Sequence, residues 1–190
     1  MKKLGMFMLL VLAVAMLGGA ALAQNVGDSS VYAVTYYSNA NTKGAPDATV
    51  RVINDGDTNG YLWAAFYVFD DRQELTECCA CLTTPDGLTS ESVNSELTAN
   101  PLTGRLNTRG VIKVISSATN DPTATKPTAG IRAWGTHIQK TGTSTYAVTE
   151  TKFADANLSS GEQTLLQQLC YFDALLSGLP CTCTPEGQDF

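Results

Sequence analysis

The six cysteines of this chain constrain its fold more than any other feature, because they fall in two tight clusters far apart in the sequence. They are Cys78, Cys79 and Cys81 in the first cluster, and Cys170, Cys181 and Cys183 in the second. Bonds between adjacent cysteines or across a Cys-x-Cys sequence would close small, strained rings. We therefore expect three disulfides between the clusters, a condition that six connectivities satisfy. The first such bond, across a loop of about 90 residues, should stabilise the fold by about 4–5 kcal/mol.

The first 23 residues have the pattern of a secretory signal peptide. Lys2 and Lys3 precede an apolar run over residues 6–17, and a small-x-small sequence at residues 21–23 predicts cleavage after Ala23. The apolar run is short for a transmembrane helix, which needs about 20 residues, so we expect no membrane insertion after cleavage. An even number of cysteines is typical of a disulfide framework in an exported protein. The sequence thus predicts a secreted protein, either periplasmic or extracellular.

The charge of the chain excludes some partners. Removing residues 1–23 takes away two lysines and no acidic residue, so the net charge of −6 becomes −8. Nucleic acid and anionic membrane surfaces both require basic patches, so we expect neither as a partner. We expect one domain, with a β-sandwich over residues 24–157 and a helix and Cys-x-Cys tail over residues 158–190 packed on it.

Short runs rich in β-branched and aromatic residues predict strands. These runs are residues 31–37, 48–53, 61–69, 111–115, 131–139 and 146–153, with a weaker candidate at 92–98. Turn sequences separate them, and no helical pattern intervenes. The order predicts a mainly antiparallel, immunoglobulin-like sandwich.

The third expected strand is apolar on both faces, whereas a sandwich strand usually exposes one face to water. A helix expected over residues 161–177 is the best cover for its second face. Ser159 and Glu162 form a capping box before this helix, and Gly178 and Pro180 end it. Six apolar residues recur at helical spacing, which favours a helix that buries them against the sheet over one that binds a partner or a membrane. They are Leu165, Leu166, Leu169, Phe172, Leu175 and Leu176.

The cysteine spacing also occurs in other kinds of site. Cys78 and Cys81 have the Cys-x-x-Cys spacing of a redox dithiol or of half a zinc site, and Cys181 and Cys183 have a spacing found in metal clusters. A redox pair usually opens a helix beside a parallel strand, which is not expected here. Structural disulfides are therefore the main prediction.

One turn resembles the first half of a calcium loop. Asp55, Asp57 and Asn59 alternate before Gly60, but Phe66 stands where an EF-hand has its bidentate glutamate. A hairpin turn is the main interpretation, and calcium binding the alternative. No phosphate-binding glycine pattern is present, so no cofactor is expected.

Candidate catalytic residues are few. His137 is the only histidine, and we expect it to have a structural role. Asp70, Asp71, Glu74 and Glu77 follow the third strand and could supply the two carboxylates of a glycosidase, although such runs are usually solvated loops.

Several short motifs run through the expected sandwich: YVFD at residues 67–70, CCAC at 78–81, TPDGL at 84–88, SVN at 92–94 and NPLTG at 100–104. With these motifs the chain resembles a group of uncharacterised proteins exported by soil bacteria. The resemblance covers most of the mature chain and implies bacterial export, but it implies no activity.

Two hypotheses for the function follow from these patterns. The leading one is a non-enzymatic binding, adhesive or envelope-associated module with a protein or glycan ligand, and the loop over residues 117–130 is a candidate recognition segment. The alternative is a secreted, carbohydrate-active hydrolase that works through carboxylates.

Overall fold

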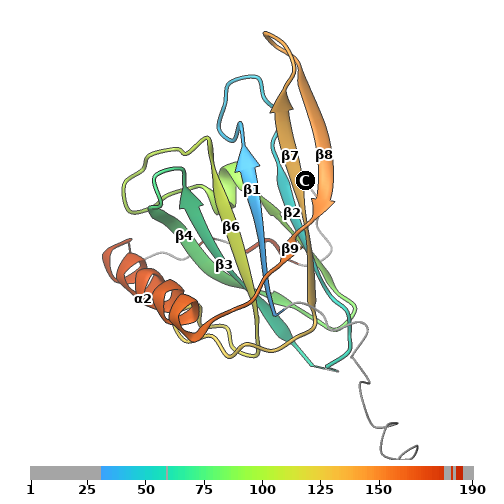
Figure 1. Cartoon of the computed structure of the whole chain (residues 1–190), viewed down its shortest axis with the longest axis vertical. Coiled ribbons are helices and arrows are strands. Elements are labelled where there is room, and N and C mark those ends of the chain that lie inside the picture. Colours follow the sequence, from blue (N-terminus) through green and yellow to red (C-terminus); the bar gives the residue numbers. More distant parts are fainter. Residues whose placement is uncertain (1–30, 59, 178–180, 182, 186–190) are drawn as a thin grey trace, which may run out of the picture.

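A computed structural model describes residues 31–58, 60–177, 181 and 183–185 (Figure 1). The expected signal peptide, residues 1–23, lies outside the described residues, as does the expected helix end at Gly178 and Pro180.

The described strands form two antiparallel sheets that pack face to face (Figure 1). The first sheet has the order β4-β3-β6-β1-β9, with β4 Leu75–Thr83, β3 Leu62–Asp70, β6 Arg109–Ser117, β1 Tyr32–Ser38 and β9 Ala154–Asp155. The second has the order β5-β2-β7-β8, with β5 Leu88–Ser92, β2 Thr49–Asn54, β7 Ile131–Lys140 and β8 Tyr146–Lys152. One described helix, α2 Ser160–Ser177, lies on the outer face of the first sheet. The expected antiparallel sandwich with a C-terminal helix is confirmed.

Strand β3 has the two buried faces that its sequence predicts. Leu62, Phe66 and Val68 point into the core between the sheets. Ala65 and Tyr67 point outward into a second core beneath α2. The helix is therefore the cover that the outer face of β3 requires.

Strands β4 and β5 were not expected from the sequence, because β4 contains a cysteine cluster and β5 is mostly polar, and neither has the usual composition of a strand. A tight turn reverses the chain after β3: the Asp70 carboxylate accepts hydrogen bonds from the backbone N–H groups of Arg72 (2.8 Å) and Glu74 (3.0 Å). Gln73 adopts a positive φ of 69° in this turn. The cysteines that follow pair residue by residue with β3.

The prediction of a weaker strand over residues 92–98 is wrong. This segment is the helical turn η1 Val93–Leu97. Ser92 caps the turn by accepting a hydrogen bond from the Ser95 N–H (3.0 Å), and the Asp47 carboxylate accepts one from the Asn94 N–H (3.0 Å). Polar caps thus outweigh the strand propensity of this segment.

The expected packing of α2 against the sheet is confirmed, but only part of its apolar stripe is buried. The helix contacts the sheet through Leu166 and Cys170, and Leu169 is half-buried. Four members of the stripe are exposed: Leu165 at 49%, Phe172 at 57%, Leu175 at 66% and Leu176 at 68%. At 100° per residue the six apolar positions span about half of the helix circumference, more than one packed face can cover. No helix among the described residues is long and apolar enough to cross a membrane.

Polar contacts fix the position of α2 on the sheet. Gln163 and Gln167 donate hydrogen bonds to the Thr125 carbonyl group (3.1 and 3.3 Å), so the β6–β7 loop packs against the helix. Glu162 accepts hydrogen bonds from the Tyr32 hydroxyl (3.0 Å) and the Lys113 ammonium (2.6 Å). Part of the segment expected to be a recognition loop therefore has a structural role.

Gly110 lies where β6 passes closest to its neighbours, and we predict that Gly110→Ala is destabilising. An added Cβ would lie 1.8 Å from the Phe69 carbonyl oxygen and 2.8 Å from the Tyr37 hydroxyl, which itself donates a hydrogen bond to that carbonyl group. The overpacking should lower the free energy of unfolding by about 1–3 kcal/mol in urea titrations. The matched control is Gly161→Ala, whose Cβ meets only the Ser159 hydroxyl at 3.9 Å. Equal stability of the two variants would contradict the packing described here.

Candidate functional site

Three disulfides join β4 to the C-terminal segment, and they pair in sequence order. The pairs are Cys78–Cys170, Cys79–Cys181 and Cys81–Cys183, with Cα–Cα distances of 5.8, 5.4 and 5.4 Å. The expectation of three bonds between clusters is confirmed, and one of six connectivities is selected. Because the order is preserved, the tail runs parallel to β4.

Alternation along β4 sends the three bonds to opposite faces of the strand. Cys78 is opposite Tyr67 and points outward to α2, whereas Cys79 is opposite Phe66 and points inward. Cys81 points inward as well. One strand thus fixes the helix on one face and the tail on the other.

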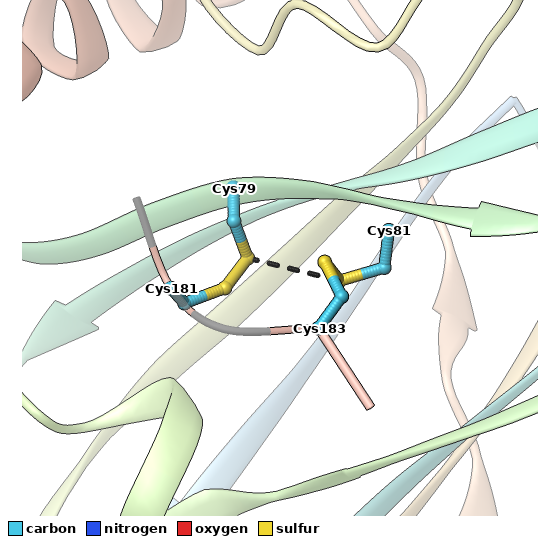
Figure 2. A group of neighbouring side chains, drawn as sticks. All are labelled: Cys79, Cys81, Cys181 and Cys183. Atoms are coloured by element: carbon cyan, nitrogen blue, oxygen red, sulfur yellow. Dashed lines mark hydrogen bonds between the residues drawn. A yellow bond between two sulfur atoms is a disulfide. The ribbon is translucent and has the colours of Figure 1, made fainter. Parts of the chain in front are cut away.

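The two inward bonds form a compact group of four sulfur atoms, here named the four-sulfur cluster: Cys79, Cys81, Cys181 and Cys183 (Figure 2). All four Sγ atoms lie within 4.8 Å of one another, and those of Cys79 and Cys81 are 4.0 Å apart. Cys79 and Cys81 are fully buried, and the two tail cysteines are half-buried against the inner core. The cluster therefore lies at the boundary between the core and the tail.

Buried glutamates also hold the tail. Glu91 of β5 accepts a hydrogen bond from the Thr184 N–H (3.2 Å), and Glu96 of η1 accepts one from the Thr184 hydroxyl (2.7 Å). Glu77 of β4 is buried, and the nearby backbone N–H of Cys181 opposes the rise of its pKa. The tail is thus bound to edge strands of both sheets, β4 and β5, and closes that side of the sandwich.

Burial shifts the ionisation of Glu77 and Glu91. Burial raises the pKa of Glu77 to about 8, and the charge of Asp173 adds to the shift. Burial also raises the pKa of Glu91 to about 8, although the Thr184 N–H opposes the shift. Each carboxyl group has one oxygen that accepts no hydrogen bond, consistent with a preference for the neutral form.

The four candidate carboxylates, Asp70, Asp71, Glu74 and Glu77, have different environments in the structure. Asp70 is buried and holds the β3–β4 turn, while Asp71 pairs with Arg109 (2.7 Å), which lowers the pKa of Asp71. Glu74 is exposed on the same turn, whereas Glu77 is buried beside the tail.

The calcium candidate has the contacts of a turn. Asp55 pairs with Arg132 (3.3 Å) and accepts a hydrogen bond from the Asp57 N–H (3.2 Å). Asn59 lies outside the described residues. These contacts favour the hairpin-turn interpretation, since an arginine at the carboxylate would repel a cation.

His137 has a structural environment, as expected. Its ring is buried, stacks on Tyr36 with 4.2 Å between ring centroids, and forms a hydrogen bond with the Thr151 hydroxyl (2.7 Å). Burial lowers the pKa of His137. The imidazole thus links β1, β7 and β8.

A groove that sequence reasoning missed lies between α2 and the outer face of the first sheet. This helix groove has a volume of about 450 Å3 and is lined by Phe69, Asp70, Gln73, Val111, Lys113, Leu165 and Leu169. The Lys113 ammonium lies 4.9 Å from the centroid of the Phe69 ring and pairs with Glu162. The sequence did contain an indication of the groove, because the apolar residues of α2 span more of the helix circumference than one packed face can bury.

Comparison with protein families, with curated proteins and with solved structures finds no match to this chain.

The disulfide connectivity can be tested by mass spectrometry. Three bonds predict that the non-reduced protein is six hydrogens lighter than its reduced form. Proteolytic peptides should pair as Cys78–Cys170, Cys79–Cys181 and Cys81–Cys183. Free thiols in protein purified without reductant, or bound metal in place of the bonds, would contradict the connectivity.

The buried glutamates predict that stability falls as pH rises. Since their folded pKa of about 8 exceeds the ordinary 4.5, the folded state holds protons that the unfolded chain releases. The stability that these two groups contribute to the folded state is fully present below about pH 4.5 and is lost as the pH rises through about 8. We expect Glu77→Gln combined with Glu91→Gln to flatten this slope in urea titrations.

Glu150→Gln is the matched control for the pH experiment, because Glu150 is an exposed residue of β8 paired with Arg51. This variant should keep the slope of the parent protein. A double glutamine variant with an unchanged slope would show that Glu77 and Glu91 are not its source.

Proposed function

We propose that this protein is an exported, non-enzymatic binding module, adhesive or envelope-associated, that holds a protein or glycan ligand at the helix groove. Its three disulfides indicate an oxidising environment, extracellular or periplasmic. The resemblance to proteins exported by soil bacteria and the signal-peptide pattern of residues 1–23 support export.

The observation that carries this proposal is the exposed apolar surface of α2. Leu165, Phe172 and Leu176 recur at spacings of seven and four residues, so they lie on one side of the helix. Leu165 and Leu169 continue this surface into the helix groove. Contiguous exposed apolar surface on a folded domain marks an interaction site.

The helix presents this surface on a rigid support. The Cys78–Cys170 bond anchors the middle of α2 to β4, and the contacts of Gln163 and Gln167 anchor its first half to the β6–β7 loop. A surface ordered before binding loses little conformational entropy when a ligand arrives.

The chemistry of the groove favours a protein ligand over a glycan. Leucine side chains form the helix wall, with Phe69 and Val111 on the sheet. Aliphatic side chains of a partner fit such a groove, in the way that amphipathic helices dock into apolar grooves. The hydrolase alternative has less support, because its candidate carboxylates have structural contacts. Asp70 accepts hydrogen bonds in the β3–β4 turn, Asp71 pairs with Arg109, and Glu77 is buried beside the tail.

We predict that replacing two exposed residues of α2 abolishes ligand capture without affecting the fold. Ligands would be sought with a glycan array and with envelope proteins, and their affinities measured by biolayer interferometry. Phe172→Ser combined with Leu176→Ser should weaken binding at least about tenfold, since burying each side chain is worth about 1.5–3 kcal/mol. The melting temperature should stay unchanged, because both side chains are more than half exposed.

Val148→Ser is the matched control, because Val148 is 54% exposed on β8, away from α2. Equal affinities of both variants would disprove the exposed apolar surface of α2, which Leu165 continues into the helix groove, as the binding surface. Polymer hydrolysis that disappeared with Asp70→Asn or Glu74→Gln would overturn the non-enzymatic proposal itself.

A further inference from the structure

We propose that the four-sulfur cluster, once its two disulfides are reduced, is a binding site for a single zinc ion. The inference is independent of the helix groove and of any ligand there, since Cys79 and Cys81 point to the opposite face of the sheet.

The positions of the sulfur atoms already approach a tetrahedral site. Zinc binds four thiolates at about 2.3 Å, which places the sulfurs of a regular tetrahedron about 3.8 Å apart. In the oxidised protein no two of the four Sγ atoms are more than 4.8 Å apart, and the Cys79 and Cys81 Sγ atoms are 4.0 Å apart. Only the bonded pairs must separate, and shifts of about an ångström or two are enough.

Two independent segments supply the ligands in a two-plus-two arrangement. Cys79 and Cys81 project from one face of β4, and Cys181 and Cys183 project from the parallel tail toward them (Figure 2). Each pair is separated by one residue, so each pair presents both sulfurs to the same space.

The tail has contacts besides the two disulfides that keep it in place. The Thr184 N–H donates a hydrogen bond to Glu91, and the Thr184 hydroxyl donates one to Glu96. Reduction of the two inner bonds therefore leaves Cys181 and Cys183 opposite their partners, so the site is largely formed before metal arrives.

The surroundings also suit a thiolate metal site. Cys79 and Cys81 belong to the inner core, and the tail cysteines pack against it, so apolar side chains shield the sulfurs from water. Four soft sulfur ligands in tetrahedral array select zinc over oxygen-seeking cations such as magnesium and calcium.

The chemistry requires a reductant before the metal. A dithiol donates two electrons and two protons to each disulfide and is itself oxidised to a disulfide, so two dithiols yield four cysteine thiols. Binding of Zn²⁺ then forms four zinc–sulfur bonds and releases four protons from the thiols. A disulfide sulfur offers no thiolate, so the oxidised and metal-bound states exclude each other.

Cobalt titration of the mature protein tests the site, because Co²⁺ reports tetrahedral thiolate coordination in its visible spectrum. Protein reduced with dithiothreitol and desalted under argon should bind one Co²⁺ per chain with the intense absorption of a tetrathiolate complex. Equimolar Zn²⁺ should remove that absorption, and oxidised protein should show none. Circular dichroism before and after metal would follow the fold of the reduced chain.

Two double variants, each lacking one disulfide, form a matched pair. Cys78→Ser with Cys170→Ser leaves the four-sulfur cluster intact and should keep the tetrathiolate spectrum. Cys79→Ser with Cys181→Ser leaves two of the four thiols and should lose the tetrathiolate spectrum. Its affinity for Co²⁺ should fall by more than the roughly 10–100-fold that follows when a residue hydrogen-bonded to a metal ligand is changed. The proposal is overturned if reduced wild-type protein, folded or unfolded, gives no such spectrum, or if both variants give the same one.

Discussion

The covalent attachment of the C-terminal segment to β4 is the constraint on which the rest of the structure depends. Because successive side chains of a strand point to opposite faces, three nearby cysteines reach α2 on one side and the tail on the other. The helix then covers the outer face of β3, and the tail closes the side of the sandwich. The outer core, the position of the helix groove and the burial of Glu77 and Glu91 all follow from this attachment.

The buried glutamates and the four-sulfur cluster are two parts of one arrangement. A hydrogen bond from the tail satisfies one oxygen of Glu91, while the sulfur bonds bring the same tail against the inner core and beside Glu77. Polar groups buried in this way are costly unless they are paired, so the tail and the glutamates require each other. The groove on the opposite face contains no cysteine and depends on the same strand only through Cys78 and its bond to α2.

How much could be predicted depends on the type of signal. The apolar runs of β3 and β7 and the capping box of α2 are local patterns, and they predicted these elements to within one or two residues. The segment Leu75–Thr83 was missed as a strand because its glutamate and cysteines are buried by partners about 100 residues away. The helix groove was missed for a related reason, since helical spacing identifies an apolar face but not how much of it a sheet covers. Disulfide order likewise depends on the direction in which the tail returns, which no local pattern encodes.

Strand β4 is the outermost strand of its sheet, the position at which β-proteins are most exposed to pairing with a strand of another molecule. Here the chain's own tail runs in the same direction as β4 and is bonded to it at two successive inward positions. We therefore expect an oxidised molecule to resist edge-to-edge aggregation along this strand better than a molecule whose tail is not bonded.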